Sequence, residues 1–142
     1  MTEQKANTHV ESGYAPVNGL KMYYEIHGSG QPPLVLLHGG LSAIGTSFGK
    51  VLPSFARTRQ VIGVEQQAHG HTADIERPLS YEQMADDTAA LLRHIGVEQA
   101  DFFGYSVGWR RPPDCHPAPG AGAQAGGGLG HIQQRGIPHR SF

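Results

Sequence analysis

The spacing of apolar residues predicts where the ordered part of this chain begins. Apolar and polar residues alternate over residues 20–27, which is the period of a strand with one buried face. Residues 14–17 form a second short strand candidate, and Asn18-Gly19 between them favours a tight turn in which both residues have positive φ. The chain is therefore predicted to open with an antiparallel hairpin.

Three later runs are apolar without alternation, which is typical of strands covered on both faces. They are residues 34–37, residues 61–64 and the shorter run 101–103, which precedes Gly104. Residues 79–96 carry a helical pattern instead: Ser80 and Gln83 form a capping box at its start, and Gly96 suits its end. The apolar face of that helix is predicted to comprise Tyr81, Met84, Thr88, Leu91, Leu92 and Ile95.

Buried strands that alternate with helices predict an α/β fold in which a mostly parallel sheet follows the hairpin. Residues 42–55 are ambiguous, because Pro53 and several glycines interrupt a helical pattern. The predicted organisation is a disordered N-terminus over residues 1–12, an ordered body over residues 13–108 and a distinct segment over residues 109–142.

Composition sets that last segment apart. Residues 1–108 contain seven Lys and Arg against eleven Asp and Glu, whereas residues 109–142 contain four against one. Sixteen of these 34 residues are Gly, Pro or Ala, and only three are large aliphatics. Such a segment has little apolar surface to offset the entropy lost on ordering, so we expect it to be disordered or poorly packed.

The pattern Gly104-Tyr105-Ser106-Val107-Gly108 directly follows a predicted strand. A serine on a sharp strand-to-helix turn presents its hydroxyl above the sheet edge, and glycines on either side remove Cβ atoms that would clash there. Ser106 is therefore the candidate nucleophile, with Gly104 and Gly108 shaping the turn. The backbone N–H of Val107 is a candidate donor to an oxyanion.

A second glycine-rich loop, His38-Gly39-Gly40-Leu41, follows the predicted strand 34–37. Glycines there let the backbone approach a substrate closely. Gly40 is the first candidate for the other oxyanion donor and Leu41 the second. We interpret His38 and Gly39 as residues that shape the loop, not as a base.

Together, PLVLLHGG, VIGVEQQAHGHT, the capped helix and DFFGYSVG resemble the first half of an α/β-hydrolase, over residues 13–108. The resemblance implies a serine, acid and histidine triad in that chain order, and chemistry on esters, lactones, thioesters or activated carbon–carbon bonds. Family members with dehalogenase or epoxide-hydrolase chemistry use an aspartate nucleophile, which Ser106 does not match. No cofactor is implied.

The family pattern stops after Gly108, and the triad acid and histidine are absent from this chain. Pro113 lies too deep for the first turn of the expected helix, and His116, His131 and His139 lack a suitable context. Reading one nucleotide later permits a continuation such as GVALQIAIRHPELVRKLVVAS, which has the expected helix and strand. We therefore hypothesise a fold truncated after the nucleophile elbow by a frameshift, with little or no activity in this chain and an exposed edge on its last strand.

The remaining features limit the function classes. Glu65, His69 and His71 could suggest a metal site, but a strand-end loop is the favoured interpretation, so no metal is predicted. A net charge of −1 argues against nucleic-acid binding. No apolar run suits a signal peptide or a membrane span, which predicts a cytoplasmic protein whose partner is a small acyl substrate. The alternatives are a non-catalytic fragment or binding module, and a C–C bond hydrolase or perhydrolase of the same fold.

Overall fold

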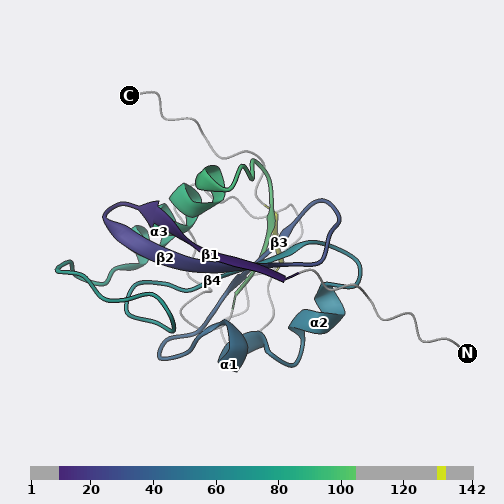
Figure 1. Ribbon diagram of the computed structural model, residues 1–142, viewed down its shortest axis with the longest axis horizontal. Coiled ribbons are helices and arrows are strands. Elements are labelled where there is room, and N and C mark those ends of the chain that lie inside the picture. The colour runs from purple at the N-terminus through teal and green to yellow at the C-terminus, as the bar shows by residue number, and fades with distance from the viewer. Residues whose placement is uncertain (1–9, 105–130, 134–142) are drawn as a thin grey trace, which may run out of the picture.

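The computed structural model describes residues 10–104 and 131–133, and these form one mixed sheet flanked by helices (Figure 1). The strands are β1 (Val10–Val17), β2 (Leu20–His27), β3 (Leu34–Leu37), β4 (Val61–Val64), β5 (Asp101–Gly104) and β6 (His131–Gln133). The helices are α1 (Ile44–Phe48), α2 (Leu52–Phe55) and α3 (Tyr81–His94). The sheet order is β1-β2-β4-β3-β5-β6.

Strand β3 runs parallel to both of its neighbours, β4 and β5, and the other pairs are antiparallel. The α/β class with an N-terminal hairpin and parallel strands is thus confirmed. The hairpin turns at Asn18 and Gly19, whose φ angles are 50° and 80° as the dipeptide predicted. Strand β1 begins at Val10, so the expectation of disorder over residues 1–12 is wrong for residues 10–12. The pairing of β1 with the whole length of β2 orders them.

Two layers of helix cover the sheet. Figure 1 shows α3 on one side of the strands and α1 with α2 on the other. Alternate residues of the central strands separate accordingly: Ile62 packs with Leu91 and Leu92 of α3, whereas Val61 packs with Ile44 and Phe48 of α1. Burial on both faces explains why the sequence of these strands shows no alternation.

The ambiguous segment 42–55 resolves into two short helices separated by the turn at residues 49–51. In α3 the Ser80 hydroxyl accepts a hydrogen bond from the Gln83 N–H at 3.1 Å, and Gly96 follows the helix with φ 79°. The capping box is half formed, because the Gln83 side chain donates to Asp87. The buried face differs from the prediction: Tyr81 is 39% exposed, while Asp87 is fully buried.

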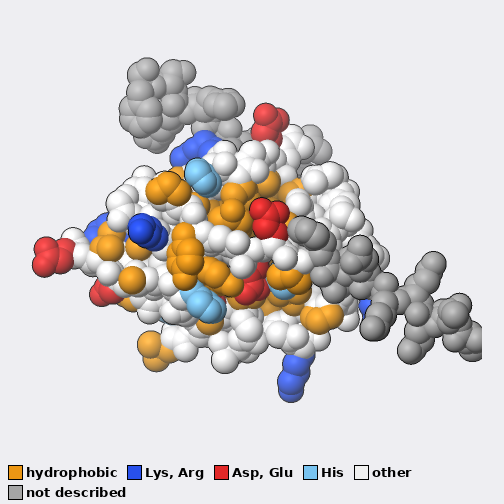
Figure 2. Space-filling model, in the orientation of Figure 1, with side chains coloured by type: hydrophobic (Ala, Val, Ile, Leu, Met, Phe, Trp, Pro, Cys, Tyr) orange, Lys and Arg blue, Asp and Glu red, His pale blue; other side chains and the backbone are white. Residues whose placement is uncertain are grey.

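The two outer strands of the sheet are β1 and β6. Val10 and Tyr14 of β1 are each 53% exposed, and Figure 2 shows apolar side chains interspersed with charged ones on the face toward the viewer. At the other end, β6 pairs antiparallel with β5. The expectation of an exposed edge on β5 is therefore wrong, and residues 131–133 form a short strand within the segment predicted to be disordered or poorly packed. No helix of the described residues is long and apolar enough to cross a membrane.

Candidate active site

The carboxyl ends of the three parallel strands meet at one edge of the sheet. Leu37, the last residue of β3, is in register with Val64 at the end of β4 and with Gly104 at the end of β5. The loops that follow these strands therefore leave the sheet side by side, where open α/β sheets bind ligands. Gly104 is buried at this edge. Ser106, Val107 and Gly108 lie outside the described residues.

The loop after β3 is held by the first helix. The N–H of the buried Gly39 donates to Ser47 Oγ at 3.3 Å, and Ser42 Oγ lies 2.6 Å from the same atom. Between these anchors, Gly40 is exposed and Leu41 is completely exposed with a φ of 57°. Among the described residues, nothing accepts a hydrogen bond from the N–H of Gly40 or Leu41. Both candidates for the oxyanion donor of this loop are thus uncommitted within the described part of the chain.

His38 uses both ring nitrogens to join two loops. Its Nδ1 lies 2.7 Å from the Gly39 carbonyl oxygen, and the Gln66 N–H donates to its Nε2 at 3.0 Å. The proton therefore sits on Nδ1, and the ring is neutral. Burial lowers the pKa of His38 below its usual value, with the neighbouring His69 adding to the effect. With both ring nitrogens bonded, His38 joins the loop after β3 to the loop after β4.

Glu65 is a buried carboxylate at the same edge, with 1% of its surface exposed. Its Oε2 accepts from the Ile44 N–H at 3.0 Å, and its Oε1 accepts from the N–H and Nδ1 of His71 at 2.8 and 2.7 Å. Burial alone would raise the pKa of Glu65, but these hydrogen bonds outweigh it and hold the pKa below the usual value. Glu65 thus fastens the loop after β4 to the start of α1.

The candidate metal cluster does not converge. His71 contacts Glu65, but His69 turns to the other loop, with its ring centroid 4.8 Å from that of His38 and its Nδ1 2.8 Å from the Gln67 carbonyl oxygen. Within residues 10–104 and 131–133, no group of three His, Cys, Asp or Glu is placed to hold a metal ion. His69 and His71 thus bond to different partners.

A polar network behind this edge has no counterpart in the sequence-based predictions. Gln67 accepts from Arg77 Nε at 2.8 Å, and Arg77 donates to both carboxylate oxygens of Asp87. Asp87 also accepts from Asn18 in the hairpin turn and from Gln83 on its own helix. Apart from the pair Gln83 and Asp87, the partners are ten or more positions apart in sequence, so no local pattern predicts the network. Its effect is to lock the loop after β4 against α3 and the hairpin.

Gln66 contacts both His38, through its backbone N–H, and α3, through its side chain. Its side-chain Nε2 donates to Thr88 Oγ1 at 2.9 Å. Its Oε1 is buried and has no hydrogen-bond partner among the described residues. Burying an amide oxygen without a partner is costly, so this atom is a point of weakness in an otherwise well-bonded edge.

The sequence of this chain is similar to a known family and to several individual proteins. The family model described as alpha/beta hydrolase fold matches residues 32–108, just over half of the chain. A proline iminopeptidase from Clostridioides difficile is 33% identical over 70% of this chain and 36% of its own length. A putative carbamate hydrolase from Azorhizobium caulinodans is 33% identical over 67% of this chain and 35% of its own length.

Solved structures match over a similar span. The epoxide hydrolase CorEH superposes with a TM-score of 0.66 and 29% identity over 70% of this chain and 35% of its own. The enol-lactonase from Burkholderia xenovorans gives a TM-score of 0.61 and 25% identity over 67% and 37%. The chain therefore spans about a third of the length of these relatives.

Proposed function

Because the chain belongs to the alpha/beta hydrolase fold family, we propose that its nucleophile is Ser106 and that the parent reaction is hydrolysis of an ester or a related acyl bond. The observation that carries the proposal is the register of the parallel strands. Leu37 and Gly104 are paired, so the loop 38–41 and the GYSVG segment leave adjacent strands at the same edge. A nucleophile and an oxyanion donor need that proximity.

In the proposed reaction, the Ser106 hydroxyl attacks the acyl carbonyl carbon, and the negative charge that develops on its oxygen is held by two backbone N–H groups. Val107 supplies one and Gly40 the other, with Leu41 as the second candidate. The uncommitted N–H of Gly40 and the anchoring of its loop to Ser47 support this role. One donor of this kind is worth roughly 10²–10³ in rate.

The general base is the weak point of the site. His38 has no free nitrogen, and Glu65 is sealed by three hydrogen bonds with a lowered pKa. The ring of His69 packs against that of His38. His69 lies in the loop after β4, and β4 is two strands away from β5, which precedes Ser106. A serine hydroxyl without a base is a poor nucleophile at neutral pH. We therefore propose that this chain by itself has only a small residual turnover.

Substrate class follows from the nucleophile. Epoxide hydrolases are among the similar structures, but the family members with that chemistry use an aspartate where this chain has Ser106. An iminopeptidase, a carbamate hydrolase and a lactonase are also among the relatives, and their names share cleavage of a bond at a carbonyl carbon. Acyl chemistry is thus the reading that agrees with the residue at position 106.

The test compares hydrolysis of p-nitrophenyl acetate and butyrate by the full chain with that by Ser106→Ala. Ser54→Ala is the matched control, because Ser54 is an exposed serine on α2 and not part of the proposed site. The proposal expects a small rate that falls with Ser106→Ala and is unchanged with Ser54→Ala. Equal rates for all three proteins would defeat it and leave the non-catalytic reading.

A further inference from the structure

A cavity of about 670 Å³ lies at the opposite edge of the sheet. Its walls include the residues that precede the parallel strands: Pro33 before β3, Gln60 before β4 and residues 97–99 before β5. Each of these strands is four residues long, so about 13 Å of sheet separates this edge from the proposed active site. The cavity therefore serves no step of the proposed reaction.

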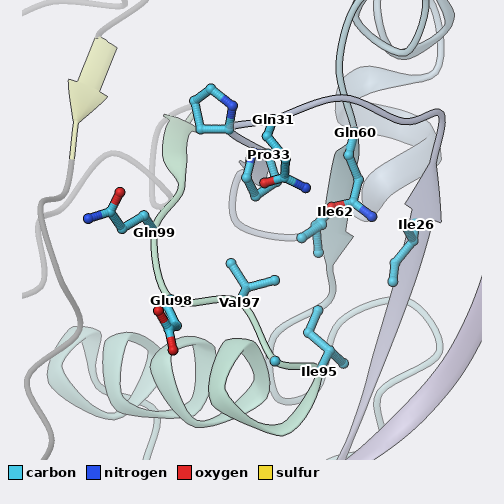
Figure 3. A pocket seen from close by; sticks show the side chains of 11 residues that line it. Ile26, Gln31, Pro33, Gln60, Ile62, Ile95, Val97, Glu98 and Gln99 are labelled. Carbon is cyan, nitrogen blue, oxygen red and sulfur yellow. The ribbon is translucent and has the colours of Figure 1, made fainter.

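The floor of the cavity is aliphatic. Figure 3 shows Ile62, Ile95, Val97 and Ile26 around one space, from β4, β2 and the connection between α3 and β5. Ile95, Val97 and Ile26 are half-buried, and Ile62 is fully buried beneath them. Covering this surface with the apolar part of a ligand would remove it from water, which is the main favourable contribution to binding in such a site.

The rim is made of amides. Gln31 and Gln60 lie on one side of the cavity and Gln99 on another (Figure 3). Within the part of the chain that the structure describes, none of these three side chains makes a hydrogen bond. A carboxamide both donates and accepts, so the rim suits a head group with a carbonyl or hydroxyl oxygen.

The charge of the lining selects among such head groups. Among the described residues that line the cavity, Glu98 is the one charged residue, and the guanidinium of Arg59, which donates to the Pro32 carbonyl, is already paired with Asp101. An anionic head would meet a carboxylate without a compensating cation. An uncharged head exchanges its hydrogen bonds with water for hydrogen bonds with the three amides.

We propose that this cavity binds an uncharged amphipathic small molecule. Its alkyl or aryl part lies on Ile62, Val97 and Ile95, and its amide, ester or hydroxyl head bonds to Gln31 and Gln60. The volume falls in the range of about 300–1,000 Å³ that is usual for ligand pockets. This site goes beyond the proposed hydrolysis and does not depend on it, because it uses the other edge of the sheet.

The test follows the fluorescence of N-phenyl-1-naphthylamine, an uncharged aromatic amine, with the full chain, and its displacement by decanamide, decanoate and decylamine. The three competitors share an alkyl chain and differ in head-group charge. Decanamide is expected to displace the probe at least about tenfold more effectively than decanoate. Equal or stronger displacement by decanoate or by decylamine would overturn the uncharged class, and no displacement by decanamide would overturn the site.

Variants locate the binding. Gln60→Leu removes one rim amide and is expected to weaken decanamide about five- to tenfold, the usual loss for one hydrogen bond. Gln31→Leu is the second variant, so that a folding defect in one leaves the other informative. Lys50→Leu adds the same side chain at an exposed position between α1 and α2 and is expected to leave decanamide binding unchanged. Unaltered affinity in both glutamine variants would contradict the proposal.

Discussion

Replacing Glu65 by glutamine tests whether the buried carboxylate holds the active-site edge together. The carboxylate accepts three hydrogen bonds, one from Ile44 and two from His71. Glutamine keeps a single acceptor oxygen and turns an NH₂ toward a donor, so at least one N–H loses its partner. Hydrogen bonds to a charged group are worth about 1.5–3 kcal/mol, and the side chain of His71 is 60% exposed and screened. We therefore expect Glu65→Gln to lower the free energy of unfolding by about 2–4 kcal/mol at pH 7.

The pH dependence gives this prediction a second readout. The pKa of Glu65 in the folded state lies below the ordinary value of 4.5. The carboxylate therefore contributes stability that is complete above pH 4.5 and is lost as the pH falls through the lower folded pKa. Urea unfolding of the wild type should weaken over that acid range, and Glu65→Gln should lack this part of the loss.

The control is Glu76→Gln, which changes an exposed glutamate without a hydrogen bond among the described residues. It should leave the free energy of unfolding within about 0.5 kcal/mol of the wild type. If Glu65→Gln were equally mild, or if its stability fell with acid as steeply as that of the wild type, the assigned role of Glu65 would be wrong.

Four further predictions follow from individual residues. Ala68→Gly should raise the free energy of unfolding by about 0.5–1 kcal/mol, because Ala68 has a φ of 65°; a lower urea midpoint would contradict this. Asp87→Ala should cost about 3–5 kcal/mol by leaving Arg77 without its buried partner, and a loss below about 1 kcal/mol in the same assay would refute it. Burial lowers the pKa of His38, so stability should be complete above pH 6.5 and fall as the pH drops from 6.5 toward the lower folded pKa; a His38→Gln protein that keeps this slope in urea titrations would exclude His38 as its source. The nucleotide sequence across codon 108 should contain one inserted or missing base, and a clean reading frame would end the frameshift hypothesis.

Short sequence patterns predicted the elements, because turn formation, helix capping and strand alternation depend on residues that are close together in sequence. Alternation over residues 20–27 and the Asn18-Gly19 dipeptide were enough for the hairpin, and Ser80 and Gly96 marked the ends of α3 correctly. The continuous run 34–37 was sufficient for a strand with helices on both faces. In each case the pattern that predicts the element lies within a few residues of the sequence.

The long-range interactions could not be predicted in this way. Asp87 falls beside the predicted helix face, and its burial depends on Arg77 and Asn18, which approach only in the folded chain. Glu65 read as a loop residue because nothing near it in sequence shows that Ile44 will donate to it. The pairing of β6 with β5 joins residues about thirty positions apart, across a segment with no apolar pattern.

The measurement that tests the central claim most directly is thiol cross-linking across the proposed site. A Cys115→Ser background removes the native thiol, and Leu41→Cys with Ser106→Cys places one thiol on each of the two loops. The account predicts fast intramolecular cross-linking by a short bifunctional maleimide, and much slower reaction for the pair Gln99→Cys with Ser106→Cys, because Gln99 lies at the opposite edge. Equal rates for the two pairs, or faster reaction of the second, would contradict the placement of Ser106 beside the loop 38–41.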